Sequence, residues 1–95
     1  MSGTFGLLGR MRAQPGKRAE LVGILQESSR GVPGKLQYLI QLEQDDPDAF
    51  WINEVWSDRA AYEACVTLPQ IVRGMELATP LIAAMEHRTE TIPQV

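Results

Sequence analysis

Residues 32–60 read VPGKLQYLIQLEQDDPDAFWINEVWSDRA, and this run contains two strands joined by an acidic turn. Polar and apolar side chains alternate over residues 36–43, which is the pattern of a half-buried strand. A turn is predicted around Asp46-Pro47, because Asp and Pro favour turn backbones. Residues 50–56 form the next predicted strand and carry large apolar groups on both faces. We therefore expect both faces of this strand to be covered.

The sequence on either side of this run adds a strand and a helix before it and a helix directly after it. Alternation predicts a first strand over residues 5–13. Apolar groups at helical spacing then predict a helix from Lys17 to the break at Gly31. Ser57 or Asp58 can cap the following helix by accepting its free N–H groups.

The C-terminal part predicts more helix and a final strand. One apolar stripe at helical spacing comprises Ile71, Met75, Ala78, Ile82 and Met85. Thr79-Pro80 suits an internal restart of that helix, and residues 87–92 read as a polar strand. The element order is then β-α-β-β-α-β, the ferredoxin-like α+β arrangement of an antiparallel sheet with helices on one face.

One face of this sheet stays uncovered in a single chain. It carries leucine or tryptophan on at least two strands, and an exposed apolar face of that size implies a partner. The simplest partner is a second copy of the chain. We therefore predict a homodimer that packs sheet against sheet.

Length and composition limit the function classes. The chain has 95 residues, so we expect a single domain over residues 1–95. Its net charge of −3, with basic residues dispersed among acidic ones, gives no electrostatic footprint for nucleic acid. Neither a membrane-spanning apolar stretch nor a signal peptide is visible. The single cysteine, Cys65, cannot form an internal disulfide and fits the reducing cytoplasm, which is the location we predict.

The sequence contains no motif for a bound cofactor or metal. Its glycines form neither GxGxxG nor GxxxxGK[ST], the two phosphate-binding patterns. The only histidine, His87, lies far from Cys65 in the sequence, with no second pair of metal ligands nearby. We therefore expect no cofactor and no metal.

A set of aromatic and polar residues remains as the candidate for chemistry. It comprises Arg10, Tyr38, Phe50, Trp51, Asn53, Glu54, Trp56 and Tyr62. Such residues can line an apolar pocket with few polar anchors, as in small-molecule sites. They can equally form a core in which aromatic rings keep one hydrogen bond each. Glu54 shares a strand face with Trp56, and a buried carboxylate needs a partner, for which Arg10 is the candidate.

Four motifs along the chain, taken in order, carry a family resemblance. They are Gln14-Pro15-Gly16-Lys17-Arg18 with Glu20-Leu21, Val32-Pro33-Gly34 followed by Tyr38, Asp46-Pro47 with Phe50, and Glu54-Val55-Trp56-Ser57-Asp58-Arg59-Ala60. In order and spacing they resemble the antibiotic biosynthesis monooxygenase (ABM) domain family over a core of about residues 4–92. The strand end with Glu54 and Trp56, followed by a helix, is the most specific motif.

The resemblance implies a dimeric α+β barrel of ferredoxin-like protomers. Family members include small monooxygenases of quinols or polyketides that use neither flavin nor metal, and heme-degrading monooxygenases. In the cofactor-free members, a deprotonated phenolic substrate passes an electron directly to dioxygen. The resemblance thus implies a monooxygenase that oxidises a small aromatic quinol or phenolic compound. The alternatives are a non-catalytic ligand-binding or interaction module on the same scaffold and, less favoured, a heme-binding or heme-degrading protein.

The resemblance extends to particular residues. Trp56 stands where the family's strand tryptophan lines the cavity, and Glu54 matches the family's glutamate. Cys65 and Gln70 stand where many members carry histidine, and Gly9 stands where heme-degrading members carry asparagine. The pocket candidates are Trp56, Tyr38, Tyr62, Glu54, Arg10 and Cys65.

Overall fold

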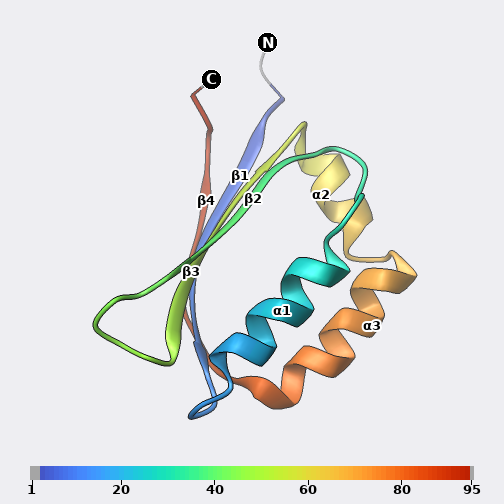
Figure 1. Cartoon of the computed structure of the whole chain (residues 1–95). Helices are drawn as coiled ribbons and strands as arrows, with labels where there is room; N and C mark the ends of the chain where they lie inside the picture. The colour runs from blue at the N-terminus through green and yellow to red at the C-terminus, as the bar shows by residue number, and fades with distance from the viewer. Residues whose placement is uncertain (1–2, 95) are drawn as a thin grey trace.

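The computed structural model describes residues 3–94, which fold into a four-stranded sheet with helices packed beside it (Figure 1). Along the chain the elements are β1 (Phe5–Ala13), α1 (Arg18–Ser28), β2 (Lys35–Leu42), β3 (Ala49–Trp56), α2 (Arg59–Cys65), α3 (Pro69–Ala78), the 3₁₀ helix η1 (Thr79–Leu81) and β4 (Ile82–Thr91). This order confirms the predicted ferredoxin-like α+β class.

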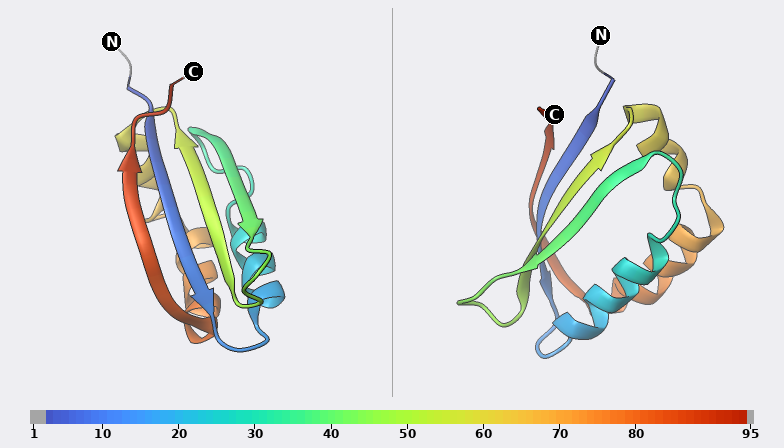
Figure 2. Two further views of the ribbon diagram at one scale, coloured as in Figure 1. Left: turned by 90° about the vertical axis from the view of Figure 1, so that its left-hand side faces the viewer. Right: turned by 45° about the horizontal axis from the view of Figure 1, so that its top comes forward.

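The sheet has the strand order β2-β3-β1-β4, and every neighbouring pair is antiparallel. All three α-helices lie on one side of the sheet (Figure 2). Within residues 3–94, no helix covers the opposite side, which we call the open face. The functional groups of the chain are therefore divided between a helix-covered face and an open face.

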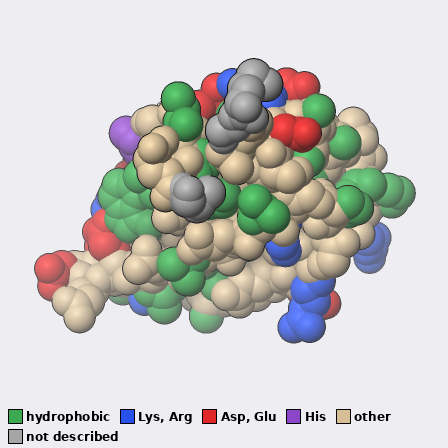
Figure 3. All heavy atoms as spheres, turned by 90° about the horizontal axis from the view of Figure 1, so that it is seen from above, with side chains coloured by type: hydrophobic (Ala, Val, Ile, Leu, Met, Phe, Trp, Pro, Cys, Tyr) green, Lys and Arg blue, Asp and Glu red, His purple; other side chains and the backbone are tan. Residues whose placement is uncertain are grey.

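The face of the molecule seen from above is mixed in character. Seen from above, lysine and arginine side chains are spread among acidic and apolar groups and do not gather in one patch (Figure 3). None of the helices in residues 3–94 combines the length and the apolar character that crossing a membrane requires.

The β2–β3 hairpin forms where its alternation and turn residues predict it. The Asp46 carboxylate accepts a hydrogen bond from the backbone N–H of Asp48 at 3.0 Å, which closes the turn. Arg18 in the first turn of α1 donates to three hairpin carbonyls, those of Glu43, Asp46 and Ala49, at 3.2, 2.8 and 3.1 Å. One guanidinium therefore ties α1 to the hairpin.

β3 carries side chains to both faces of the sheet. Phe50, Ile52 and Trp56 point toward the helices and are buried. Trp51 points to the open face, where it is half-buried and donates its Nε1–H to Glu43 at 2.9 Å. The apolar side chains on the helix side of β3 are thus covered, whereas those on the open face are only partly covered within one protomer.

The C-terminal third departs from the sequence prediction. α3 ends at Ala78, and a single 3₁₀ turn leads into β4 at Ile82. The helix predicted as far as Met85 is therefore wrong, and the last strand begins at Ile82 instead of His87. Pairing with β1 makes this segment a strand, since Ile82 lies opposite Ala13 in the sheet.

The predicted helix caps are partly confirmed. Asp58 accepts a hydrogen bond from the backbone N–H of Ala61 at 2.7 Å and so caps α2. Thr79 has helical backbone angles, and its hydroxyl donates to the carbonyl of Met75 at 2.6 Å. The predicted restart at Thr79-Pro80 is therefore a 3₁₀ turn and not a new α-helix.

α1 and α3 approach each other closely at one glycine. A Cβ atom on Gly74 of α3 would lie 2.5 Å from Ser28 Cβ, so no side chain fits there without movement. One turn earlier, the Gln70 side chain donates to the carbonyls of Ser28 and Arg30 at 2.9 and 2.8 Å. These carbonyls lie at the end of α1 and just after it, where backbone acceptors lack helical partners. Gln70 and Gly74 together join the two helices.

Alanine at Gly74 is expected to destabilise the protein by about 1–3 kcal/mol, because the added methyl group overpacks the α1–α3 contact. Gly23 is the matched control, since it lies within α1 and nothing lies within 4 Å of an added Cβ. There, alanine is expected to stabilise the protein by about 0.5–1 kcal/mol through helix propensity. Urea unfolding measures both changes, and a stabilising Gly74→Ala would contradict the close approach.

The interior consists of two buried clusters. One lies under α1 and α3 and includes Leu21 and Phe50, which are fully buried. The other lies under α2 and includes Phe5, Trp56 and Cys65. A cavity opens where the two clusters meet, because its wall contains members of both.

Candidate functional site

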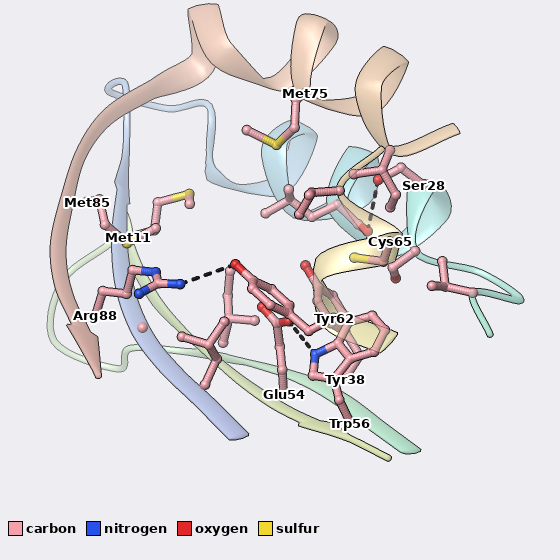
Figure 4. Close-up of a pocket in the computed structure, with 18 residues that line it drawn as sticks. Met11, Ser28, Tyr38, Glu54, Trp56, Tyr62, Cys65, Met75, Met85 and Arg88 are labelled. Atoms are coloured by element: carbon pink, nitrogen blue, oxygen red, sulfur yellow. Dashed lines mark hydrogen bonds between the residues drawn. The ribbon is translucent and has the colours of Figure 1, made fainter. Parts of the chain in front are cut away.

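A pocket of about 340 Å³ lies between the sheet and the helices (Figure 4). Small-molecule sites typically have volumes of about 300–1,000 Å³. All four strands and all three α-helices contribute to the wall, which is mostly apolar. Glu54, Tyr62 and Arg88 lie together at one end of it (Figure 4). The pocket therefore has an apolar part and a compact polar part.

Glu54 of β3 is the carboxyl group of the pocket wall. Alternation along β3 places it on the helix-covered face, where Trp56 donates its Nε1–H to Glu54 Oε1 at 2.9 Å. Burial raises the pKa of Glu54 above its usual 4.5, and the Trp56 hydrogen bond and the charges of Arg88 and Lys35 oppose that rise. A raised carboxyl pKa moves toward the neutral range in which a general base works best.

Tyr62 of α2 and Arg88 of β4 form the second polar feature. Arg88 donates from Nη2 to the Tyr62 hydroxyl at 3.2 Å. The Tyr62 ring packs against Phe5, with centroids 5.1 Å apart, and lies edge-on to Trp56 at 5.8 Å. The Tyr62 hydrogen bond is the main cause that raises the pKa of Arg88, so the guanidinium stays charged. A fixed positive charge therefore lies beside the cavity.

Tyr38 of β2 and Cys65 of α2 are two further titratable groups of the pocket wall. Burial raises the pKa of the Tyr38 phenol, and the Glu54 charge adds to the rise. Burial also raises the pKa of the Cys65 thiol, again with a contribution from Glu54. Both groups are therefore protonated at neutral pH, and neither is a ready proton acceptor.

Thioethers line the other part of the pocket. Met11 of β1 is buried, whereas Met75 of α3 and Met85 of β4 are 43% and 51% exposed. Met75 and Met85 come from opposite walls (Figure 4). Gly9 lies beside Met85, and a Cβ atom there would be 3.7 Å from Met85 Sδ. This half of the pocket is apolar and polarisable, and it reaches the solvent.

Five of the six predicted pocket residues line the cavity: Trp56, Tyr38, Tyr62, Glu54 and Cys65. The sixth, Arg10, lies on the open face, so the predicted Arg10–Glu54 pair is wrong. The register between β1 and β3 gives the reason. Arg10 lies opposite Trp51, whereas Glu54 lies opposite Leu7 on the other face.

Arg10 instead belongs to an ion-pair network on the open face. It donates to both carboxylate oxygens of Glu43, at 2.7 and 2.8 Å, and pairs with Glu86. Arg12 continues the network to Asp46 at 2.7 Å and to Glu86 at 2.9 Å. The Arg10 hydrogen bond is the main cause that lowers the pKa of Glu43 to about 2.

Sequence reasoning missed Arg88, Met75 and Met85 as pocket residues. Arg88 lies in a polar strand, and only the β1–β4 register places it opposite Gly9. One feature of the sequence pointed to this contact: Gly9 lies inside a predicted strand, and a glycine there often marks the close approach of another group. The two methionines were placed on one helical stripe, but Met85 belongs to a strand.

The histidine positions of the resembling family take other roles in this chain. Gln70 lies outside the pocket and bonds to the end of α1. The only histidine, His87, lies on the open face with its ring 6.0 Å from that of Trp51. No histidine of residues 3–94 lines the cavity, so a histidine-ligated heme does not fit this pocket.

Known proteins match this chain over most of its length. The model of the antibiotic biosynthesis monooxygenase family matches residues 4–77. A solved structure from Chloroflexus aurantiacus, provisionally named an antibiotic biosynthesis monooxygenase, is 40% identical in sequence. It superposes with a TM-score of 0.95 and covers 97% of this chain and 94% of that chain.

More distant matches extend the comparison. A mutant of SnoaB, a cofactor-independent oxygenase from Streptomyces nogalater, has a TM-score of 0.83 at 16% identity, covering 98% of this chain and 95% of that chain. At this identity the likeness concerns the fold alone. An uncharacterized protein of Synechocystis sp. is 28% identical over 78 residues, or 79% of this chain. The matched region spans about half, 53%, of that curated relative.

Proposed function

The chain belongs to the antibiotic biosynthesis monooxygenase family, and we propose that it is a cofactor-independent monooxygenase of small aromatic quinols or phenolic compounds. The observation that carries the proposal is the meeting of three groups in one apolar cavity: the Glu54 carboxyl, the Tyr62 hydroxyl and the Arg88 guanidinium. A half-buried acceptor beside a fixed positive charge suits a substrate that must lose a proton and hold a negative charge.

Each polar group has a separate role in the proposed reaction. Glu54 accepts the phenolic proton, for which its raised pKa suits it. Arg88, oriented by Tyr62, stabilises the resulting phenolate. Trp56 forms a wall of the cavity and orients the Glu54 carboxyl through its indole N–H. The mostly apolar lining keeps bulk water away from the reacting atoms.

The substrate itself supplies all the electrons. The phenolate passes one electron to dioxygen, and the two radicals combine at a ring carbon to give a peroxide. Loss of water from this peroxide leaves a quinone. One oxygen atom of dioxygen becomes a ring carbonyl and the other leaves as water, so one phenol and one dioxygen give one quinone and one water. The balance requires no external reductant. SnoaB, named a cofactor-independent oxygenase, shares this fold.

A panel of naphthols and naphthalenediols tests the proposal. Oxygen uptake should exceed that of buffer alone, should follow the protein concentration and should accompany quinone formation. The same compounds should raise the unfolding temperature when oxygen is removed. Folded protein that neither binds nor oxidises any member of the panel would rule out this function.

A non-catalytic binding module is the second candidate function. It is favoured by one observation: within residues 3–94 the pocket wall holds no imidazole, the usual general base near neutral pH. The two functions differ in one result. A binding module gives the thermal shift with the phenols but no oxygen uptake above that of buffer.

We also propose that two copies associate through their open faces into a dimeric α+β barrel. Supporting features are Leu39, which is 42% exposed on the edge strand β2, and the half-buried Trp51 and Val55 of β3. The ion pairs of Arg10 and Arg12 neutralise charges on this face within each protomer, so burying the face costs less than it would with unpaired charges. Sedimentation should give a dimer at micromolar concentration, and a stable monomer would contradict the barrel.

The proposal takes residues 1–95 as one domain that acts in the cytoplasm, as the sequence predicts. Its partners are then the second copy, the small aromatic substrate and dioxygen.

A further inference from the structure

We propose that the phenolic ligand of this pocket carries an apolar substituent, which lies between Met75 and Met85 at the mouth of the cavity. This inference rests on the proposed function, because it specifies which phenolic compounds the site takes. In this proposal, Met75 and Met85 select which substituents the ligand can carry.

The mouth is defined by residues that both line the cavity and reach the solvent. Val66, Met75 and Met85 belong to the pocket wall and are 49%, 43% and 51% exposed. They come from three separate parts of the fold: the residue that follows α2, helix α3 and strand β4. Three large apolar side chains of the pocket wall are thus exposed to water. A ligand that covers them would gain hydrophobic free energy.

The polarity of the cavity sets the orientation of the ligand. The hydroxyl group binds where Glu54, Tyr62 and Arg88 meet, because these are the charged and hydrogen-bonding groups at that end. Glu54 lies opposite Leu7 in the sheet and Met85 lies opposite Met11, so Met85 lies farther along the sheet from Glu54, beyond Arg88. Met75 lies on the facing wall (Figure 4). A ring bound through its hydroxyl group therefore directs a substituent on its far side toward the two methionines.

Methionine is suited to this position. Its side chain is unbranched and has three rotatable bonds, so it adapts to groups of different length. Beside Met85, Gly9 contributes no side chain, and a Cβ atom there would lie 3.7 Å from Met85 Sδ, so the thioether lies close to the backbone of β1. We therefore expect the mouth to accept a series of alkyl groups of increasing length, while the polar end keeps its requirement for a phenolic hydroxyl group.

Isothermal titration of 4-alkylphenols, from methyl to hexyl, tests the proposal in the absence of oxygen. A methylene that is fully buried strengthens binding about fourfold, and one that is half-buried about twofold. We expect about twofold per methylene for the wild-type protein. In the double variant Met75→Gln with Met85→Gln, which keeps side-chain length but adds polar groups, affinity should be nearly independent of chain length.

Two control variants separate this effect from altered folding. Met75→Leu with Met85→Leu keeps the mouth apolar and should retain the dependence on chain length. Leu77→Ala changes a residue of α3 that is 50% exposed but lies outside the pocket wall. This variant should also retain the dependence of affinity on chain length. Unfolding temperatures of all variants establish that they are folded.

The outcomes distinguish this proposal from the proposed function. If 4-methylphenol binds but longer chains bind no better, the apolar substituent is excluded and the phenol site stands. If the glutamine variant keeps the wild-type dependence, the substituent does not lie between Met75 and Met85, and the phenol site stands. A second copy of the chain that covered the mouth would give this result. If no alkylphenol binds at all, both proposals fail.

Discussion

Glu54→Gln is expected to lower turnover of a phenolic substrate by about 10²- to 10⁴-fold, the usual contribution of a positioned general base. Glutamine keeps the size of the side chain and can still accept the Trp56 N–H, but it cannot take a proton. Substrate binding should change much less than turnover, because the cavity wall is preserved. In the wild-type protein, the rate should rise with pH as Glu54 ionises, and the variant should lose that rise. A variant with wild-type turnover would exclude Glu54 as the proton acceptor.

The same substitution is expected to stabilise the protein at neutral pH. Because burial raises the pKa of Glu54 in the folded state, its favourable contribution is complete below its usual pKa of 4.5 and is lost as the pH rises through the raised value. Glutamine is neutral at every pH and avoids that loss. The unfolding temperature of Glu54→Gln should therefore exceed that of the wild type at neutral pH, and the difference should vanish below a pH of about 4.5.

Glu43→Gln is the matched control with the opposite sign. Glu43 also accepts an indole N–H, from Trp51 at 2.9 Å, but on the open face. Its pKa is lowered to about 2, chiefly by Arg10, so its stabilising contribution is present above 4.5 and is lost as the pH falls toward 2. Glu43→Gln should therefore lower the unfolding temperature at neutral pH and leave turnover nearly unchanged. Shifts of the unfolding temperature with the same sign in both variants would contradict a raised pKa for Glu54 and a lowered pKa for Glu43.

Trp56→Phe is expected to lower turnover at least about tenfold, because it removes one hydrogen bond that orients the Glu54 carboxyl. It should also destabilise the protein by about 1–3 kcal/mol, since Trp56 is 2% exposed and the smaller ring leaves a gap. The Trp56 hydrogen bond lowers the pKa of Glu54, so its loss should move the inflection of the pH–rate profile to higher pH.

Trp51→Phe is the control for this second prediction. Both tryptophans of the chain lie on β3, and each donates its indole N–H to a glutamate at 2.9 Å. Only Trp56 lies in the pocket wall. Trp51→Phe should therefore cost about 1 kcal/mol of stability through its lost hydrogen bond, with the pH–rate profile unchanged. Equal effects of the two variants on turnover would show that the pocket is not the reacting site.

Local sequence patterns predicted most of the fold, because they depend on near neighbours along the chain. The β2–β3 hairpin followed from alternation and from the turn at Asp46, and the start of α2 followed from Asp58. β4 was predicted too short, because Ile82 and Met85 fit a helical stripe as well as a strand. Pairing with β1, far away in sequence, decided between the two.

The candidate site was predictable in part for the same physical reason. Trp56 and Glu54 were recognised together because alternation places them on one face of one strand. The partner of Glu54 was assigned wrongly, since alternation within β1 does not show which of its two faces meets the helices. Arg88 became visible only through the register that sets it opposite Gly9. Contacts that arise from strand pairing therefore could not be predicted from the pattern of single segments.

The most direct test of the central claim follows isotopically labelled dioxygen into the product. A naphthol is oxidised by the protein under ¹⁸O₂, and the quinone is examined by mass spectrometry. We predict one labelled oxygen atom per quinone formed, with formation greatly reduced in Glu54→Gln. A quinone without label, or labelled quinone formed equally fast without the protein, would contradict a monooxygenase that acts in this pocket.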